Sequence, residues 1–126
     1  MPERVLVIDD ISLILDVVAN TVHMAGYEVI AASDARAALA QIEITAPDLI
    51  LLDVMMPHMS GYDFIEQLRQ RGHAIPIVLL TGKEHAPEEI EHLGVAGYLR
   101  KPFRLRELLK LLQTLLKDPQ QRNTVF

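Results

Sequence analysis

Side chains able to carry acid, metal or phosphoryl chemistry follow four short apolar runs of this chain. Asp9 and Asp10 follow the run 5–8, Asp53 follows 49–52, Thr81 follows 77–80, and Lys101 lies close after 97–99. If these runs are parallel strands of one sheet, their carboxyl ends share an edge, which is where such sheets bind ligands. Three carboxylates, one hydroxyl and one ammonium group would then converge on one site.

Such a cluster predicts a cation-dependent reaction at a carboxylate. Three neighbouring carboxylates repel one another and resist burial, so cations must accompany them. Lys101 provides one positive charge, and oxygen ligands suit a hard divalent ion such as Mg²⁺. These cations would neutralise an incoming phosphoryl group, to which Thr81 would donate a hydrogen bond. Asp53 is the best nucleophile candidate, because it follows the run expected to form the central strand.

Each of these residues also has an ordinary structural interpretation. Any one of them could cap a helix, begin a turn or be solvated. The residues concerned are Asp9, Asp10, Asp53, Thr81 and Lys101. For a single residue that interpretation would be preferred. Their occurrence at the same end of successive strands favours a functional site.

The elements that must position these residues alternate along the chain. Predicted strands cover Val5–Ile8, Val29–Ala32, Leu49–Leu52, Ile77–Leu80 and Gly97–Leu99. Helical patterns separate them, so the order of elements predicts an α/β fold. Uninterrupted apolar strands indicate a parallel sheet buried on both faces, and right-handed crossovers make it doubly wound.

Five helices are predicted from apolar residues at helical spacing and from the residues that end each pattern. The first carries Ile14, Val17, Val18, Val22 and Ala25; the second, capped by Ser33 or Asp34, carries Ala35, Ala38, Leu39 and Ile42. The third contains Phe64, Ile65 and Leu68, the fourth covers Glu88–Leu93, and the fifth runs from near Arg104 to Lys117.

The last helix has two sets of leucines. The expected core face comprises Leu105, Leu108, Leu109, Leu112 and Leu116. Leu111 and Leu115 lie off that face, since successive residues are about 100° apart around a helix. They are either residues at the edge of the core or part of a dimer or partner surface.

Composition excludes several classes of protein. The chain of 126 residues fits one domain, and because it has no cysteine, disulfides and thiolate sites are excluded. Its formal net charge of −5 gives no basic footprint for nucleic acid. No apolar run approaches the roughly 20 residues of a membrane span, and no signal peptide is recognisable, so a cytoplasmic domain without membrane contact is expected.

Histidines and methionines are given structural roles. None of the five histidines has paired ligand spacing, so surface positions are favoured over zinc for His23, His58, His73, His85 and His92. Met55, Met56 and Met59 follow Asp53 and are expected to be partly buried over the site.

The ordered motifs resemble the receiver domains of two-component response regulators. The resemblance spans essentially residues 3–117, in the segments Val5–Asp10, Pro47–Pro57, Ser60–Asp63, Ile77–Gly82 and Gly97–Phe103. It implies a flavodoxin-like strand order 2-1-3-4-5 with five helices, and a receiver domain over residues 1–118. Residues 119–126 would be a loose tail or the start of a linker, since Asp118-Pro119 suits either.

The resemblance also implies a phosphorylation-controlled signalling switch. Asp53 would accept a phosphoryl group from a sensor histidine kinase or a phosphotransfer protein. Asp10 and Asp53 would bind Mg²⁺ through their side chains, Met55 would bind it through its backbone carbonyl, and Asp9 would hold a metal-bound water. Such a domain is not an enzyme with independent turnover, although autodephosphorylation is expected.

Further residues receive roles from the same resemblance. Thr81 and Lys101 would bind the phosphoryl oxygens, and Lys101-Pro102 would be a cis peptide. Tyr98 would be an aromatic switch that moves inward when Thr81 moves toward the phosphate. The change would reach the fourth helix, the fifth strand and the fifth helix, which form a possible homodimer surface.

Two features depart from the usual receiver pattern. Gly82 stands where the family often has alanine. The segment from Thr81 to Lys101 is about two residues shorter than usual. The shortening is expected within Lys83–Leu93, which contains the fourth predicted helix.

Three other functions share parts of the pattern. A Mg²⁺-dependent aspartyl-phosphate phosphatase favours a second aspartate where this chain has Met55, and it needs a cap. A degenerate receiver would lack some of the acid pair, Asp53, Thr81 or Lys101, all of which are present. A flavodoxin-like FMN protein would need hydroxyls and glycines in place of Asp9-Asp10-Ile11.

Overall fold

A five-stranded parallel sheet forms the centre of the computed structural model, which describes residues 2–56, 58–82 and 87–116. The strands are β1 (Arg4–Ile8), β2 (Glu28–Ala32), β3 (Leu49–Asp53), β4 (Ile77–Thr81) and β5 (Gly97–Arg100). Their order is β2-β1-β3-β4-β5, and every neighbouring pair is parallel. The predicted α/β class and the 2-1-3-4-5 order are therefore confirmed.

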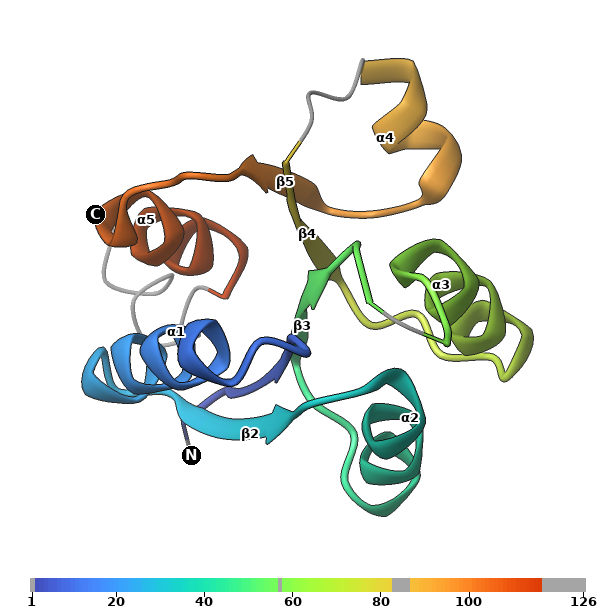
Figure 1. The fold of residues 1–126 in the computed structure, drawn as a ribbon, viewed down its shortest axis with the longest axis horizontal. Coiled ribbons are helices and arrows are strands. Elements are labelled where there is room, and N and C mark those ends of the chain that lie inside the picture. Colours follow the sequence, from blue (N-terminus) through green and yellow to red (C-terminus); the bar gives the residue numbers. More distant parts are fainter. Residues whose placement is uncertain (1, 57, 83–86, 117–126) are drawn as a thin grey trace, which may run out of the picture.

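Helices follow the strands and cover both faces of the sheet. They are α1 (Ser12–Met24), α2 (Ala35–Ile44), α3 (Gly61–Gln70), α4 (Pro87–Leu93) and α5 (Leu105–Leu115). In Figure 1, α1 and α5 lie on one side of the sheet, whereas α2 and α3 lie on the other. None of these helices is long and apolar enough to cross a membrane. The predictions for His85, Lys117, Asp118 and the tail 119–126 concern residues outside the described part of the chain.

The core consists of two apolar layers separated by the sheet. Leu6, Ile8, Ile50, Leu52 and Leu79 pack with residues of α2 and α3. Their strand neighbours Val5, Val7, Leu49, Leu51, Val78 and Leu80 pack with residues of α1 and α5. Successive strand residues point to opposite faces, so a sheet covered on both faces requires apolar residues at every position. This is why the central strands are continuous apolar runs.

The strands extend slightly beyond their predicted apolar runs. Asp53 is the last residue of β3 and Thr81 is the last residue of β4, and both are within the hydrogen-bonded ladder. Their side chains therefore stand on a rigid sheet rather than on a loop. A polar residue can occupy the last position of a buried strand because the sheet edge is where ligands and water gain access.

Helix α1 buries only some of the apolar residues that predicted it. Its buried residues are Leu15, Val18 and Val22, which share one helical face. Val17, one of the apolar residues that predicted this helix, is 44% exposed, because it lies about 100° around the helix from Val18. Ala25, which was included in the predicted helix, follows its last residue and is exposed.

The other helices largely follow their predicted faces. Asp34, not Ser33, caps α2, since its Oδ1 accepts a hydrogen bond from the amide of Ala37 at 2.7 Å. In α5, Leu108 and Leu112 are buried, but Leu105 is 42% exposed, so its assignment to the core face was wrong. Leu105 is the first residue of the helix and lines a surface groove. Leu111 and Leu115 are partly buried and pack against the core, which favours their interpretation as edge-of-core residues.

Gly61 is required by a close approach between α3 and the end of β3. A Cβ atom at this position would lie 2.9 Å from Val54 Cα and 3.2 Å from the backbone oxygen of Asp53. The Gly61 amide donates to the Val54 carbonyl at 2.9 Å, so the two segments cannot separate without loss of that bond.

We expect Gly61→Ala to destabilise the protein by about 1–3 kcal/mol, because overpacking against backbone forces the chain to shift. Urea unfolding would measure the change. Gly82→Ala is the matched control, because nothing lies within 4 Å of a Cβ added there, and we expect little change. Equal stability of Gly61→Ala and the unmodified protein would contradict the assigned role.

Candidate functional site

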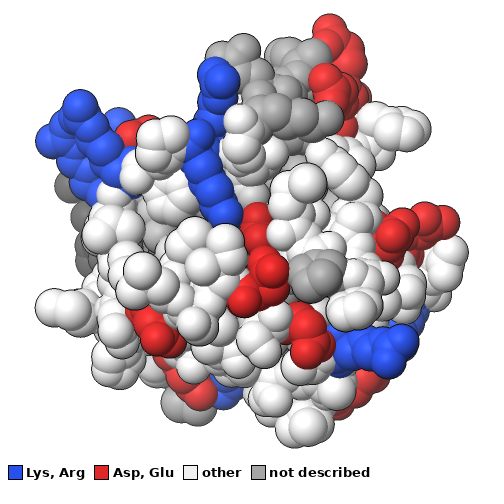
Figure 2. Space-filling view, viewed as in Figure 1, with Lys and Arg blue, Asp and Glu red and all other residues white. Residues whose placement is uncertain are grey.

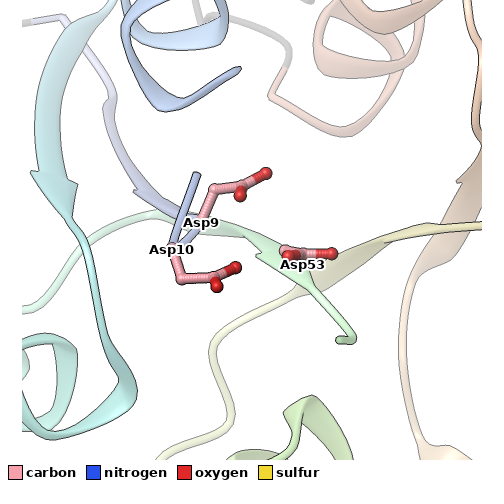
Figure 3. A group of neighbouring side chains, drawn as sticks. All are labelled: Asp9, Asp10 and Asp53. Carbon is pink, nitrogen blue, oxygen red and sulfur yellow. The ribbon is translucent and has the colours of Figure 1, made fainter. Parts of the chain in front are cut away.

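Three carboxylates meet at the carboxyl edge of the sheet. Asp9 and Asp10 directly follow β1, and Asp53 ends the neighbouring strand β3. One carboxylate oxygen from each residue lies within 4.8 Å of the others, and the three side chains extend into the same space in Figure 3. The space-filling view also shows acidic atoms near the centre of this face, below a basic side chain (Figure 2). The structure therefore brings the sequence-predicted acidic residues together.

Lys101 provides the positive charge that was expected at this cluster. Its Nζ lies 3.2 Å from Asp53 Oδ1 and 3.6 Å from Asp9 Oδ2. The backbone amide of Lys101 donates to the Thr81 carbonyl at 2.6 Å, which joins the residue to the end of β4. The Lys101-Pro102 peptide is cis, as predicted. One ammonium group thus contacts carboxylates at the ends of two neighbouring strands.

One carboxylate oxygen of Asp9 accepts no hydrogen bond in the described part of the chain. The side chain is fully buried, and its Oδ1 accepts a hydrogen bond from the Ile11 amide at 3.0 Å. Its Oδ2 has no hydrogen-bond partner among the described residues, and the ion pair with Lys101 is longer than a hydrogen bond. A buried carboxylate oxygen normally has such a partner. The unsatisfied oxygen, together with two neighbouring carboxylates, fits a hydrated hard cation such as Mg²⁺.

Asp53 is ionised less readily than an ordinary aspartate. Burial raises its pKa, and the negative charge of Asp9 raises it further. Lys101 and the Met55 amide act in the opposite direction, the latter donating to Asp53 Oδ1 at 3.4 Å. The net effect is a raised pKa, because burial and repulsion outweigh the two favourable contacts. A bound divalent cation would favour the ionised form.

This raised pKa predicts that Asp53→Asn stabilises the metal-free protein. In the unmodified protein, the raised pKa of Asp53 belongs to the folded state, and the ordinary pKa belongs to the unfolded state. The stability contributed by protonated Asp53 is therefore fully present below the ordinary pKa and is lost as pH rises through the raised pKa. The advantage of the variant therefore grows as pH rises and is complete once the pH exceeds the raised pKa of Asp53. We expect it to reach on the order of 1 kcal/mol, a common size for one residue.

Thermal unfolding of both proteins in chelator from pH 3 upward would measure this difference. Adding Mg²⁺ is expected to stabilise the unmodified protein more than Asp53→Asn, because the ion binds the folded state through this carboxylate. A variant that is less stable than the unmodified protein at neutral pH, without metal, would contradict the electrostatic interpretation.

Thr81 and Tyr98 lie on the same face of the sheet. Thr81 is 2% exposed and pairs in register with Arg100, while Tyr98 pairs with Leu79. Residues two apart on a strand share a face, so Tyr98 lies diagonally from Thr81 on the adjacent strand. Tyr98 is partly buried and packs against the core on the α2 and α3 side. The two residues therefore lie on neighbouring strands and on the same face of the sheet.

The methionines after Asp53 have different environments. Met56 and Met59 are partly buried and pack against the core, as expected. Met55 is 78% exposed, so its predicted burial was wrong. Its main chain contacts the site through the hydrogen bond to Asp53, while its side chain is directed to solvent.

The histidines do not assemble a metal site in the described part of the chain. Asp9, Asp10 and Asp53 form the metal-sized cluster found there, and no described histidine belongs to it. His23, His58 and His92 are exposed, and His73 is partly buried. His73 Nε2 lies 3.4 Å from Glu43 Oε1.

An apolar groove that was not predicted from the sequence lies beside the acidic cluster. It is lined by Leu13, Ile14, Val17, Val18, Lys101, Pro102, Phe103 and Leu105. Lys101 contributes to both the groove and the cluster, because its Nζ contacts Asp53 and Asp9. The available sequence signal was the pair of apolar residues Leu13 and Val17 on the polar side of α1, which are 72% and 44% exposed.

Comparison with known proteins identifies closely similar sequences and folds. The family model described as "Response regulator receiver domain" matches residues 5–113. Response regulator MprA of Mycolicibacterium vanbaalenii is 40% identical over 119 residues, which are 93% of this chain and 52% of that protein. The chain thus spans about half the length of the curated relatives it matches.

Solved structures show the same similarity. Chemotaxis response regulator CheY4 of Vibrio cholerae is 40% identical, with a TM-score of 0.83, covering 92% of this chain and all of that one. Response regulator protein TrrA of Thermotoga maritima, solved in complex with Mg²⁺ and BeF, is 29% identical. Its TM-score is 0.80, and the match covers 90% of this chain and 99% of that one.

Proposed function

Since this chain belongs to the response regulator receiver domain family, we propose that Asp53 is its phosphoryl-accepting residue. Receiver domains are phosphorylation-controlled switches in two-component signal transduction and receive phosphoryl groups from histidine kinases. The donor for Asp53 would be a sensor histidine kinase or a phosphotransfer protein. This assignment is favoured over a phosphatase or an FMN protein because both sequence and fold match receiver domains.

The observation that carries this proposal is the contact of Lys101 with Asp53 inside a group of three carboxylates. Asp10 and Asp53 would hold Mg²⁺ directly, together with the backbone carbonyl of Met55, and Asp9 would hold one of its waters. When bound, Mg²⁺ supplies positive charge that offsets the negative oxygens of a phosphoryl group. The unsatisfied buried oxygen of Asp9 supports this set of ligands.

In the proposed reaction, an Asp53 carboxylate oxygen attacks the phosphorus of a phosphohistidine. The new O–P bond forms as the P–N bond breaks, and the departing imidazole nitrogen keeps the electron pair and takes up a proton. Lys101 would pair with one phosphoryl oxygen, and the Thr81 hydroxyl would donate to another. Slow attack by water on the same phosphorus would release inorganic phosphate and restore the Asp53 carboxylate, without turnover of any other substrate.

Incubation with Mg²⁺ and acetyl phosphate tests the proposal, because a small donor bypasses the unidentified kinase. Intact-mass spectrometry is expected to show the addition of one phosphoryl group. No addition under conditions that phosphorylate another receiver domain would contradict the proposal.

Phosphorylation is proposed to change the face formed by α4, β5 and α5. Movement of the Thr81 side chain toward the new phosphate would leave space on the face of the sheet that Thr81 occupies. Tyr98 lies on the same face, on the neighbouring strand. Tyr98 would enter that space. Because phosphate shifts the equilibrium only by its differential binding, a minor population of the inward state is expected without phosphate.

The phosphoryl mimic beryllofluoride, with Mg²⁺, provides a test of this switch. We expect NMR chemical shifts to change from Asp53 through Thr81 and Tyr98 to α5. Sedimentation would measure whether the face formed by α4, β5 and α5 forms a homodimer. Arg104→Ala and Leu111→Ala are expected to weaken such association without changing phosphorylation. Shifts confined to Asp53 and its adjacent loop would contradict the switch.

We also propose the bounds, the location and the binding partners of the domain. Residues 1–118 would form the receiver domain, with 119–126 as a tail or linker. The domain would act in the cytoplasm, without membrane contact. It would not bind nucleic acid itself, because its formal net charge is −5.

A further inference from the structure

The guanidinium group of Arg69 joins separate backbone segments beside α3 and α4. Its Nη1 donates to the carbonyl oxygens of His73 at 3.0 Å and Ile75 at 3.1 Å, which lie between α3 and β4. Its Nη2 donates to the carbonyl oxygen of Gly94 at 3.0 Å, immediately after α4. A planar guanidinium can donate in several fixed directions, so one side chain ties the end of α4 to the segment preceding β4.

Helix α4 has few apolar attachments that could replace this tie. None of its side chains from Glu88 to Leu93 is buried, and Leu93 is the described α4 residue that packs partly against the core. The helix has seven residues and projects from the body of the protein in Figure 1. After Gly94, the Ala96 amide donates to the Ile77 carbonyl at 2.8 Å, which fixes the start of β5. Hydrogen bonds therefore hold this end of α4.

We propose that Arg69 is a positioning residue that fixes the Gly94 end of α4, so that the helix pivots about Gly94 when the domain is phosphorylated. The inference rests on the proposed function, in which the change starts at Thr81. Residues 82–86 connect Thr81 to the opposite end of α4. A helix displaced at one end and held at the other rotates rather than translates. Displacement is therefore largest near Glu88 and smallest at Gly94.

Arg69→Met tests this inference, because it removes the donors but keeps an apolar stem of similar length. Arg69→Lys is the second variant, since an ammonium group keeps the charge but cannot reproduce the guanidinium geometry. Arg71→Met is the matched control, because this neighbouring arginine contacts the exposed carboxylate of Glu43 at 3.4 Å instead of backbone. Each protein would be studied by NMR and amide hydrogen exchange, with and without Mg²⁺ and beryllofluoride.

In the unmodified protein and in Arg71→Met, we expect beryllofluoride to shift the amides of residues 88–90 strongly and those of 94–96 weakly. In both Arg69 variants the shifts are expected to extend to 94–96. Exchange of these amides without ligand is expected to be about tenfold faster, as in a local opening. The shifts that beryllofluoride causes at Asp53 and Thr81 are expected to be the same in the Arg69 variants as in the unmodified protein. That result would show that the phosphoryl site still binds the mimic.

Identical shift patterns in the Arg69 variants and the unmodified protein would overturn the pivot, as would equally large shifts at both ends of α4 in the unmodified protein. Faster amide exchange across the whole domain, with and without beryllofluoride, would also overturn the pivot. A purely structural role of Arg69 predicts that result. If beryllofluoride changes nothing at Asp53 in the unmodified protein, the proposed function fails. Unchanged exchange at 94–96 in the Arg69 variants would then separately overturn the tie itself.

Discussion

Replacing Asp53 with asparagine is expected to abolish phosphorylation of this domain by acetyl phosphate. The amide lacks the negatively charged oxygen that attacks phosphorus, and the Asp9 carboxylate lies farther from the Lys101 ammonium group, at 3.6 Å. Asp9 is fully buried with one oxygen bonded to the Ile11 amide, whereas Asp53 lies within 3.2 Å of the Lys101 ammonium. Intact-mass spectrometry is expected to show one added phosphoryl group in the unmodified protein and none in the variant.

Asp63→Asn is the matched control for this experiment. It makes the same carboxylate-to-amide change on the exposed side of α3, outside the acidic cluster, and we expect it to keep the full mass gain. Thermal unfolding of Asp53→Asn under the assay conditions distinguishes loss of the nucleophile from loss of the fold. A mass gain in Asp53→Asn equal to that of the unmodified protein would place the nucleophile elsewhere.

Removing Asp10 is expected to remove both Mg²⁺ binding and phosphorylation at ordinary Mg²⁺ concentrations. Asp10 is one of the three residues whose carboxylate oxygens lie close enough together to bind one metal ion. The domain offers few other protein ligands to that ion. We expect Asp10→Ala to weaken Mg²⁺ binding by at least about tenfold, since one charged ligand is lost. Phosphorylation is expected to fall with it, because the transferring group then lacks its counter-charge.

Titration of Mg²⁺, followed by the NMR shift of the Asp53 amide, would measure the affinity, and the acetyl phosphate reaction would measure transfer. Chelation of the metal in the unmodified protein is expected to reproduce the Asp10→Ala result. Asp16→Ala, an exposed position on α1 outside the cluster, is the control. Full phosphorylation of Asp10→Ala at the Mg²⁺ concentration that suffices for the unmodified protein would contradict the assigned role of Asp10.

Much of the framework was available from local sequence patterns. Continuous apolar runs predicted the central strands, because a sheet covered on both faces needs apolar residues at successive positions. The polar residues directly after those runs predicted the acidic edge, since parallel strands place their carboxyl ends together. The pattern alone did not distinguish strand orders; the 2-1-3-4-5 order came from the family resemblance and is present in the structure.

Helix faces were predicted less reliably than strands. Several apolar residues on one helix can satisfy the same spacing, and packing decides which of them are buried. In α1, Leu15 is buried in the protein core whereas Val17 is exposed. In α5, the first residue, Leu105, remains 42% exposed. Those outcomes depend on where a helix lies against the sheet, which residue periodicity does not specify.

The sequence by itself determined which groups reach the edge of the sheet: Asp9, Asp10, Asp53, Thr81 and Lys101. Only the tertiary structure decided that Lys101 contacts two carboxylates and that burial raises the pKa of Asp53. It also decided that one oxygen of Asp9 has no hydrogen-bond donor among the residues that the structure describes. It likewise decided that Arg69 reaches the Gly94 carbonyl, 25 residues along the chain. The physical reason is that hydrogen bonds, burial and charge interactions depend on distances between strands and helices, whereas sequence spacing specifies only the local direction of each side chain.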